Sequence, residues 1–378
     1  MRSRAAALAA VAALAACGPP GTTPAPVPAP VDARFDSVVS YLRSQVDSAF
    51  PGAVVAVGRH DTVLLLAAVG HYGIDDPHPV TPETVYDLAS LTKVVGLTTA
   101  CMMLVAEGKL DLDAPVQRYV PAFRGAGKEH VTIRHLLTHS SGLPAWRPLY
   151  TEATTRATAL ALVDTTPLAA EPGRTMVYSD LGAIVLTQAV EAITGERLDQ
   201  LLDRRLFQPL GMTSTRYLPP LDWHDRIAPT ERSQDGTIIR GTVHDENAWK
   251  LGGVSGHAGL FSTAPDLARF ATWLLRAWHG DSLPVRAFTR RQDTPAGSSR
   301  ALGWDTPSEN SSAGTRLGAN AFGHTGFTGT SIWMDPDRDV FIILLTNRVN
   351  PTRENTKIFQ VRRRVADLVV HALTPGEP

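Results

Sequence analysis

The two ends of the folded part of this chain carry mirror-image patterns of predicted structure. After the N-terminal segment, an amphipathic helical pattern precedes two apolar, strand-like runs joined by a short turn. Near the C-terminus the order is reversed, with two strand-like runs and then a helical pattern. Such an arrangement predicts one sheet built from both ends of the chain. The ranges in order are helix 35–50, strands 52–58 and 62–70, strands 329–336 and 339–347, and helix 354–373.

The region between these ends is predicted to be mostly helical, at about 90–215. One helical pattern covers 90–107 and stops before Gly108, and another covers 181–194 and stops before Gly195. A third covers 201–212. With 378 residues, the chain is long enough for one large domain or two closely joined ones. The predicted class is therefore α+β, with an antiparallel sheet from both chain ends, flanking helices and a mostly helical inserted region.

The N-terminus reads as a targeting segment followed by a spacer. "MRSR" supplies two positive charges, and a short apolar run follows that suits the core of a signal peptide. The run ends in Leu14-Ala15-Ala16-Cys17, which resembles the lipobox of bacterial lipoproteins. The resemblance implies removal of 1–16 and acylation of Cys17, which would hold the protein on a membrane. The alternative is an ordinary signal peptide with an incidental cysteine.

This reading predicts a lipid-anchored protein of the bacterial cell envelope, either periplasmic or surface-exposed. Residues 17–32 are rich in proline and are predicted to form an extended tether before a folded domain at 33–373. The net charge of −1 gives no reason to expect nucleic acid as a partner. Cys101 lies in an apolar helical run and is expected to be an inert core thiol. We expect a monomer.

The tetrad Ser90-Leu91-Thr92-Lys93 is the first candidate for chemistry. A serine hydroxyl is a poor nucleophile and needs a base nearby. At the start of a helix, residues i and i+3 share a face, so Lys93 can reach Ser90 Oγ. The helix N-terminus also favours a negative oxygen beside Ser90. For Lys93 to accept a proton its pKa must be lowered by burial or by another cation.

Two further groups of residues fit this chemistry. Tyr178 precedes an apolar helix, and a tyrosine near a cationic lysine can serve as a general base. His324-Thr325-Gly326 is expected at the start of a strand, with glycines where a substrate must approach the backbone closely. Taken alone, each group is weak support for an enzyme.

Together and in this order, the three groups resemble the serine β-lactamase and penicillin-binding-protein superfamily, particularly its class C β-lactamase-like branch. That resemblance implies the β-lactamase/transpeptidase-like fold, with the nucleophile at the head of a helix beside an antiparallel sheet. It implies that Ser90 is acylated, that Lys93 helps to deprotonate it, and that Tyr178 is the general base. The oxyanion hole would be the backbone N–H groups of Ser90 and Phe327. No metal and no cofactor is implied.

Two longer stretches extend the resemblance over nearly the whole chain. Residues 131–144 look like a recurrent structural stretch of this branch. Residues 243–274 are similar to the segment that precedes the third of these groups, His324-Thr325-Gly326, in the superfamily. The closest likeness is to cell-wall-associated members, which include low-activity carboxypeptidases and muropeptide amidases.

Two positions depart from the superfamily pattern, in the set expected to bind substrate: Asp180, His324, Thr325, Gly326 and Phe327. Asp180 stands where asparagine is usual, and an ionised aspartate offers only acceptors. It can hold either Lys93 or a substrate N–H. His324 stands where lysine is usual, and histidine is only partly protonated at neutral pH. This substitution weakens the case for efficient β-lactam hydrolysis.

Other residues have alternative readings. His244, Asp245, Glu246 and His257 invite a metal site, but no metal-ligand spacing is present, and the histidines are expected to organise loops. Trp146 and Trp249 are open between a substrate cleft and the core.

The predicted function is a serine hydrolase that works through an acyl-enzyme on Ser90. The expected substrates are peptidoglycan-derived peptides, which implies a D-alanyl carboxypeptidase or a muropeptide amidase. One alternative is a small-ester carboxylesterase with weak or no β-lactamase activity. Another is a non-catalytic binding lipoprotein, which the intact Ser90, Lys93 and Tyr178 disfavour.

Overall fold

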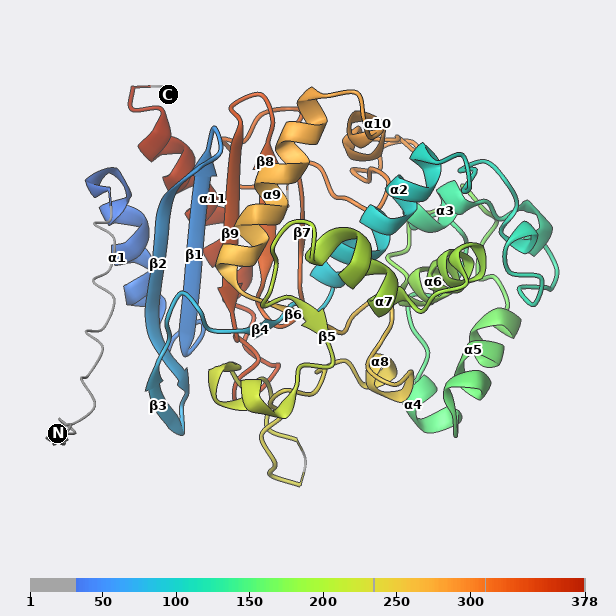
Figure 1. Cartoon of the computed structure of the whole chain (residues 1–378), viewed down its shortest axis with the longest axis horizontal. Coiled ribbons are helices and arrows are strands. Elements are labelled where there is room, and N and C mark those ends of the chain that lie inside the picture. The colour runs from blue at the N-terminus through green and yellow to red at the C-terminus, as the bar shows by residue number, and fades with distance from the viewer. Residues whose placement is uncertain (1–31, 234, 310, 377–378) are drawn as a thin grey trace, which may run out of the picture. The chain divides into compact units, whose positions relative to one another are not determined.

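A six-stranded antiparallel sheet joins the two ends of the chain, as the sequence predicts (Figure 1). The computed structural model describes residues 32–233, 235–309 and 311–376. Along the sheet the strands follow the order β3-β2-β1-β9-β8-β7. The first and last long strands pair directly, with Val54 opposite Leu345 and Val57 opposite Ile342. The strand bounds are β1 Gly52–Arg59, β2 Thr62–Gly73, β3 Asp76–Pro79, β7 Phe322–Thr325, β8 Ser331–Asp335 and β9 Val340–Thr346.

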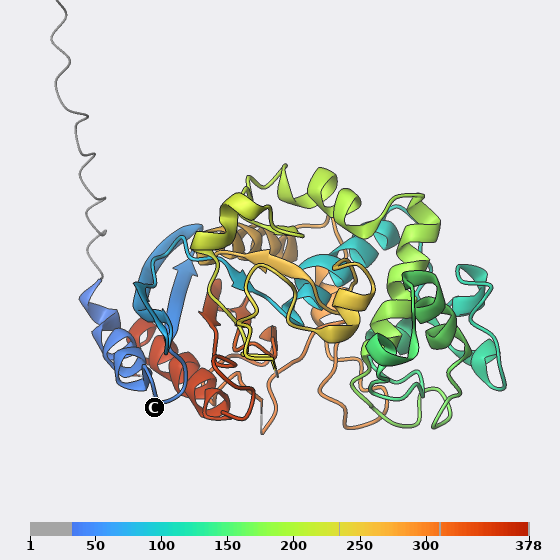
Figure 2. The same ribbon diagram turned by 90° about the horizontal axis from the view of Figure 1, so that it is seen from below.

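Helices cover both faces of this sheet. Helices α1 (Asp36–Gln45) and α11 (Ile358–Leu373) pack together on one face, and α9 (Ala264–His279) contacts β1 and β9 on the other (Figure 2). Successive side chains of β1 alternate between the two apolar cores, because a strand has a side-chain period of two. Val55 packs with α1 and α11, whereas Val54 belongs to the larger core.

The larger core extends into the helical region, where α6 is buried along most of its length. A small second sheet has the order β4-β6-β5 and carries the chain toward Ser90. The strands of this second sheet are β4 Tyr86–Asp87, β5 Arg216–Tyr217 and β6 Leu260–Ser262. The other α-helices are α2 Thr99–Ala106, α3 Ile133–Leu137, α4 Leu149–Glu152, α5 Arg156–Thr165, α6 Asp180–Thr194, α7 Leu198–Leu202, α8 Glu246–Lys250 and α10 Val285–Thr289. A π-helical turn at Lys93–Thr98 precedes α2, and another at Asp203–Phe207 follows α7.

Several predicted helix limits are wrong by a few residues. Helix α1 ends at Gln45 rather than near Phe50, because Asp47 has a positive φ of 60° and its N–H binds the carbonyl of Phe50. Helix α11 begins at Ile358 rather than at 354. The helical pattern predicted over 201–212 ends at Phe207.

The predicted signal peptide, Cys17 and nearly all of the tether lie outside the described residues, so lipid attachment stays a prediction. Within the part of the chain that the structure describes, no helix combines the length and apolar character needed to cross a membrane. Cys101 is buried, and this burial raises the pKa of its thiol, as expected of an inert core cysteine.

Candidate active site

Ser90 lies on a sharp turn between β4 and the π-helical turn at Lys93–Thr98. The residue before it, Ala89, has a left-handed φ of 47°. A buried carboxylate holds this conformation, since Asp87 Oδ1 accepts the Ala89 N–H at 2.8 Å. Asp87 Oδ2 accepts the N–H of His244 at 2.7 Å. Left-handed residues other than glycine are strained and cluster at functional sites. Here the strained Ala89 directs the next residue, Ser90, into a pocket.

Lys93 is 3% exposed and is surrounded by three acceptors. Its Nζ lies 3.0 Å from Ser90 Oγ, 2.9 Å from the carbonyl oxygen of His257 and 2.7 Å from Asp180 Oδ1. The contacts with Ser90 and His257 are hydrogen bonds and the contact with Asp180 is an ion pair, so the buried charge of Lys93 is compensated. Of the two roles open to Asp180, the structure shows the contact with Lys93.

The expectation of a lowered Lys93 pKa is wrong. Burial by itself would lower this pKa, but the Asp180 carboxylate and the Tyr178 phenol together raise it above its ordinary value. Lys93 is therefore an ammonium ion at neutral pH. It donates a hydrogen bond toward Ser90 Oγ.

Tyr178 lies just before α6 and points into the same pocket as Ser90. Its hydroxyl is buried and has no hydrogen-bond partner among the described residues. Two cations face its ring, with Lys93 Nζ 4.9 Å and the Arg300 guanidinium carbon 5.3 Å from the ring centroid. The His139 ring packs against it at 4.5 Å between centroids. The phenol oxygen is therefore placed to form a hydrogen bond with a group that enters the pocket beside Ser90.

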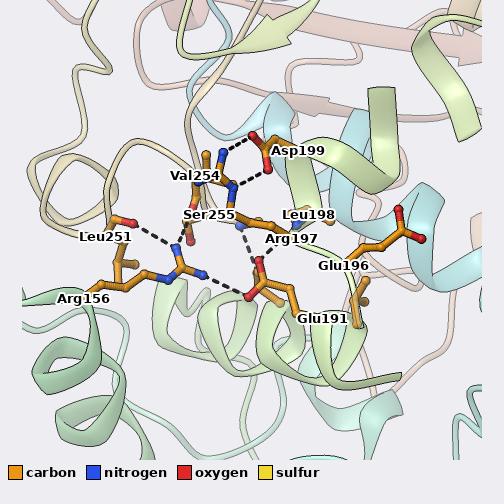
Figure 3. Close-up of polar contacts among 12 residues, drawn as sticks. Arg156, Glu191, Glu196, Arg197, Leu198, Asp199, Leu251, Val254 and Ser255 are labelled. Carbon is orange, nitrogen blue, oxygen red and sulfur yellow. Dashed lines mark hydrogen bonds and ion pairs between the residues drawn. The ribbon is translucent and has the colours of Figure 1, made fainter. Parts of the chain in front are cut away.

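The loop that supplies the His257 carbonyl is held from the far side by Arg156 (Figure 3). Arg156 Nη1 donates to the carbonyl oxygens of Leu251 and Val254, at 2.9 Å each. Its Nη2 lies 3.0 Å from Glu191 on α6. Thus the acceptor for Lys93 lies on a loop that is tied to two helices of the inserted region.

The ring of His257 is fixed at both nitrogens. Nδ1 lies 2.7 Å from Ser255 Oγ, and Nε2 lies 2.9 Å from Asp245 Oδ1. His244 pairs with Glu231 at 2.9 Å and stacks on the Phe327 ring. These histidines organise loops, as expected. In residues 32–376, apart from the undescribed 234 and 310, no group of three or more metal-ligating side chains is gathered.

His324 lies near the end of β7, not at the start of a strand as predicted, because the turn that leads into β8 follows directly. It is 4% exposed. Nδ1 lies 2.8 Å from the Thr325 carbonyl oxygen, so Nδ1 carries the proton. Nε2 is buried without a partner in the described chain. Burial, then the charges of Arg300 and Lys93, hold the His324 pKa well below its ordinary value.

These observations correct the predicted charge role of His324. The side chain is neutral at neutral pH, because a proton would be buried beside two cations. It cannot supply the partial positive charge expected from the sequence. It presents an acceptor, Nε2, instead.

The loop after β7 is tied to the strand that leads to Ser90. Thr328 Oγ1 donates to the Asp87 carbonyl at 2.7 Å, and Thr330 Oγ1 donates to the Leu88 carbonyl at 3.0 Å. Any side chain at Gly326 would put Cβ 2.4 Å from the Leu88 oxygen, so glycine is required there. These contacts fix the N–H of Phe327 relative to Ser90. The Phe327 side chain itself is 48% exposed at the pocket rim.

Arg300 is a pocket residue that the sequence analysis missed. It lies in an irregular segment between α10 and β7, where no motif or periodicity marks it. Its Nε and Nη1 are buried and lack hydrogen-bond partners among the described residues. The pocket has a volume of about 250 Å³, and it is lined by Ser90, Tyr178, Arg300, Asp305, His324, Thr325, Gly326, Phe327, Trp333, Arg348, Phe359 and Arg362.

Trp146 and Trp249 are both largely exposed, which excludes the core reading for them. Neither is among the residues that line this pocket.

A family model described as Beta-lactamase matches residues 35–367. The chain belongs to this family. Curated relatives named "Putative D-alanyl-D-alanine carboxypeptidase" from Salmonella typhi and from Salmonella schwarzengrund (strain CVM19633) are each 32% identical over 363 residues, which cover 84% of this chain and 83% of theirs. This β-lactamase-family protein is accordingly a serine hydrolase of the β-lactamase and penicillin-binding-protein superfamily.

Solved structures share the fold of this β-lactamase-family hydrolase. A penicillin-binding-protein homologue from Caulobacter crescentus has a TM-score of 0.73 at 22% identity, covering 90% of this chain and 98% of that one. The hydrolase EstCE1, with promiscuous acyltransferase activity, has a TM-score of 0.72 at 23% identity, covering 89% and 99%. A class C β-lactamase has a TM-score of 0.69 at 20% identity, covering 89% and 97%.

The buried neutral histidines predict a loss of stability in mild acid. Burial, and then nearby positive charges, place the pKa of both His139 and His324 well below 6.5. Below about pH 6.5, His139 and His324 bind protons in the unfolded chain but stay neutral in the folded protein. The free energy of unfolding should therefore fall as pH drops, by about 1.4 kcal/mol per pH unit for each histidine once the unfolded form is fully protonated.

Denaturant unfolding of the domain at pH 5, 6 and 7 measures this slope. His139→Asn keeps a residue that tolerates the left-handed backbone and should remove roughly half of the pair's contribution. His130→Asn, at an exposed position, is the matched control and should keep the full slope. Equal slopes in His139→Asn and the unmodified protein would contradict the neutral assignment of His139.

Proposed function

We propose that this hydrolase is a carboxypeptidase of the D-alanyl type, which removes the C-terminal residue from peptidoglycan-derived peptides. The names of the Salmonella relatives support this substrate class. One observation in the pocket carries the proposal. Arg300 places a guanidinium with two buried, unpartnered N–H groups beside Ser90, in a space of about 250 Å³.

A free C-terminal carboxylate is the substrate group that best fits Arg300. A planar guanidinium binds a carboxylate through two parallel hydrogen bonds, and an unpartnered buried cation gains most from such a partner. Neutral His324 can accept a substrate N–H at Nε2. In this proposal, Arg300 supplies the positive charge that the neutral His324 lacks.

The reaction follows from the arrangement around Ser90. With the substrate carboxylate on Arg300, Ser90 Oγ attacks the carbonyl carbon of the last peptide bond. The Tyr178 hydroxyl relays the proton, because its oxygen accepts the proton of Ser90 Oγ while its own proton passes to the leaving amine as the C–N bond breaks. The N–H groups of Ser90 and Phe327 stabilise the negative oxygen. Water then attacks the acyl-enzyme carbonyl, and a proton of the water passes through the Tyr178 hydroxyl to Ser90 Oγ as the bond between the acyl carbon and Oγ breaks.

A small-ester carboxylesterase is the second candidate, favoured by the exposed Phe327 ring at the pocket rim. An apolar rim suits an ester that has no carboxylate to offer Arg300. A muropeptide amidase would use the same acyl-enzyme with a different leaving group. The three candidates differ in their need for a free carboxylate one residue beyond the cleaved bond.

Arg300→Gln tests the carboxypeptidase directly. The substrate pair is diacetyl-L-Lys-D-Ala-D-Ala and its C-terminal amide, which differ only in the carboxylate. The unmodified enzyme should prefer the acid. We expect the variant to lose about 2–4 kcal/mol on the acid, roughly 30- to 1,000-fold in kcat/KM, and to change little on the amide.

Arg291→Gln is the matched control for this experiment. Arg291 is an exposed arginine in the same segment, and its guanidinium is already bound to Thr306 and to the carbonyl of Pro307. The Arg291→Gln variant should keep the preference of the unmodified enzyme for the acid over the amide. Equal losses on acid and amide in Arg300→Gln would remove the basis for a carboxypeptidase, and rapid turnover of simple esters alone would favour the carboxylesterase.

A further inference from the structure

Two buried arginines hold the loop that carries the Phe327 N–H. Arg362 extends from α11, and its Nη2 donates to the carbonyl oxygens of Gly326 at 2.6 Å and Thr330 at 2.8 Å. Arg348 follows β9, and its Nε donates to the Phe327 carbonyl at 2.8 Å. Three carbonyl groups of this short loop therefore receive guanidinium donors.

Arg362 is an unusual residue to bury. It is 4% exposed, and no carboxylate among the described residues lies within ion-pair distance of its guanidinium. Its Nε has no hydrogen-bond partner in that part of the chain. Burial, together with the charge of Arg348, lowers the Arg362 pKa to about 9. A cation in such a site is costly unless its field acts on a negative group.

The negative group that the geometry offers is the oxyanion of the reaction. The Gly326 carbonyl and the Phe327 N–H belong to one peptide group, and Arg362 binds that carbonyl. A cationic donor on the oxygen draws electron density from the nitrogen, so the N–H becomes a stronger donor. Arg348 binds the carbonyl of the next peptide group and has no such effect on this N–H.

We propose that Arg362 is a positioning residue for the oxyanion hole, which holds the Gly326–Phe327 peptide and polarises its N–H toward the oxygen of the reacting carbonyl. The inference rests on the acyl-enzyme chemistry of the proposed function, but not on its substrate class. It assigns a role in the reaction to α11, the helix from which Arg362 reaches both the pocket lining and the loop after β7.

The test compares Arg362→Met with Arg362→Lys on p-nitrophenyl butyrate, a neutral ester that does not need Arg300. We expect Arg362→Met to lower kcat about tenfold with little change in KM, less than the roughly hundredfold or greater loss that follows removal of a whole oxyanion-hole donor. Arg362→Lys keeps a cation and should recover part of the loss. If Arg362→Met does not fold, Arg362→Gln, which keeps a donor without the charge, replaces it.

An infrared measurement separates polarisation from a merely structural role. The acyl-enzyme is formed with a ¹³C-labelled acyl group, and its carbonyl band is recorded. Weaker hydrogen bonding should move the band to higher wavenumber in Arg362→Met. The matched variant Arg348→Met removes the other buried guanidinium that contacts this loop. It should leave the carbonyl band near its original position.

If the unmodified enzyme is acylated but the band does not move in Arg362→Met or in its Gln replacement, the role of Arg362 is overturned. The proposed function is not affected by that result. An equal shift in Arg348→Met also overturns it, because both arginines would then only hold the loop. If the unmodified protein forms no acyl-enzyme with any ester or penicillin, the proposed function fails and this inference fails with it.

Discussion

A Ser90→Ala variant is expected to lose acylation completely while keeping its fold. Ser90 Oγ is the nucleophile in the proposed reaction, and Lys93 Nζ already lies 3.0 Å from it. Alanine keeps the backbone N–H and the turn but has no oxygen to acylate. Turnover should fall by roughly 10⁴-fold or more, as loss of an activated nucleophile does.

Intact mass after incubation with a fluorescent penicillin, and separately with p-nitrophenyl butyrate, measures this directly on residues 31–378. The unmodified protein should gain the mass of the acyl group, and Ser90→Ala should not. Ser44→Ala, at an exposed position on α1, is the matched control. Thermal unfolding shows that the fold is kept. Normal turnover by Ser90→Ala on any substrate of the unmodified enzyme would refute the assignment.

A Tyr178→Phe variant is expected to lower the acylation rate by about 10²- to 10⁴-fold, the range for loss of a general base. Lys93 is held by two hydrogen bonds and by the ion pair with Asp180, which raises its pKa, so we do not expect it to replace the phenol. The Tyr178 hydroxyl has no partner among the described residues, so its removal should cost little stability. Rapid-mixing measurement of the acylation step gives the rate.

Tyr41→Phe is the control for Tyr178→Phe, because Tyr41 lies on α1 on the far face of the sheet. It should acylate at the rate of the unmodified enzyme. Near-normal acylation by Tyr178→Phe, combined with complete loss in Lys93→Met, would return the role of base to Lys93.

The two departures from the superfamily boxes have different consequences in three dimensions. Asp180 sets the charge state of Lys93, because its carboxylate lies 2.7 Å from Nζ. His324 is uncharged, and the arginines that line the pocket, Arg300 among them, lie outside the three groups of residues that resemble the superfamily pattern. If the proposed function holds, the sequence pattern alone therefore misplaces the positive charge that would bind a substrate carboxylate.

Features of this protein that depend on local pattern and spacing could be predicted from its sequence. Alternating and continuous apolar runs at both ends predicted the sheet, and β1 and β9 do pair at its centre. The three-residue spacing of Ser90 and Lys93 predicted their contact, because residues that far apart meet on one helical face.

The electrostatics of the site, by contrast, depend on contacts between distant parts of the chain. The charge of Lys93 depends on Asp180, the neutrality of His324 depends on burial and on Arg300, and Arg362 reaches Gly326 from another helix. A pKa is set by burial and by charges a few ångströms away. Those neighbours lie tens of residues away along the chain, so no local pattern contains them.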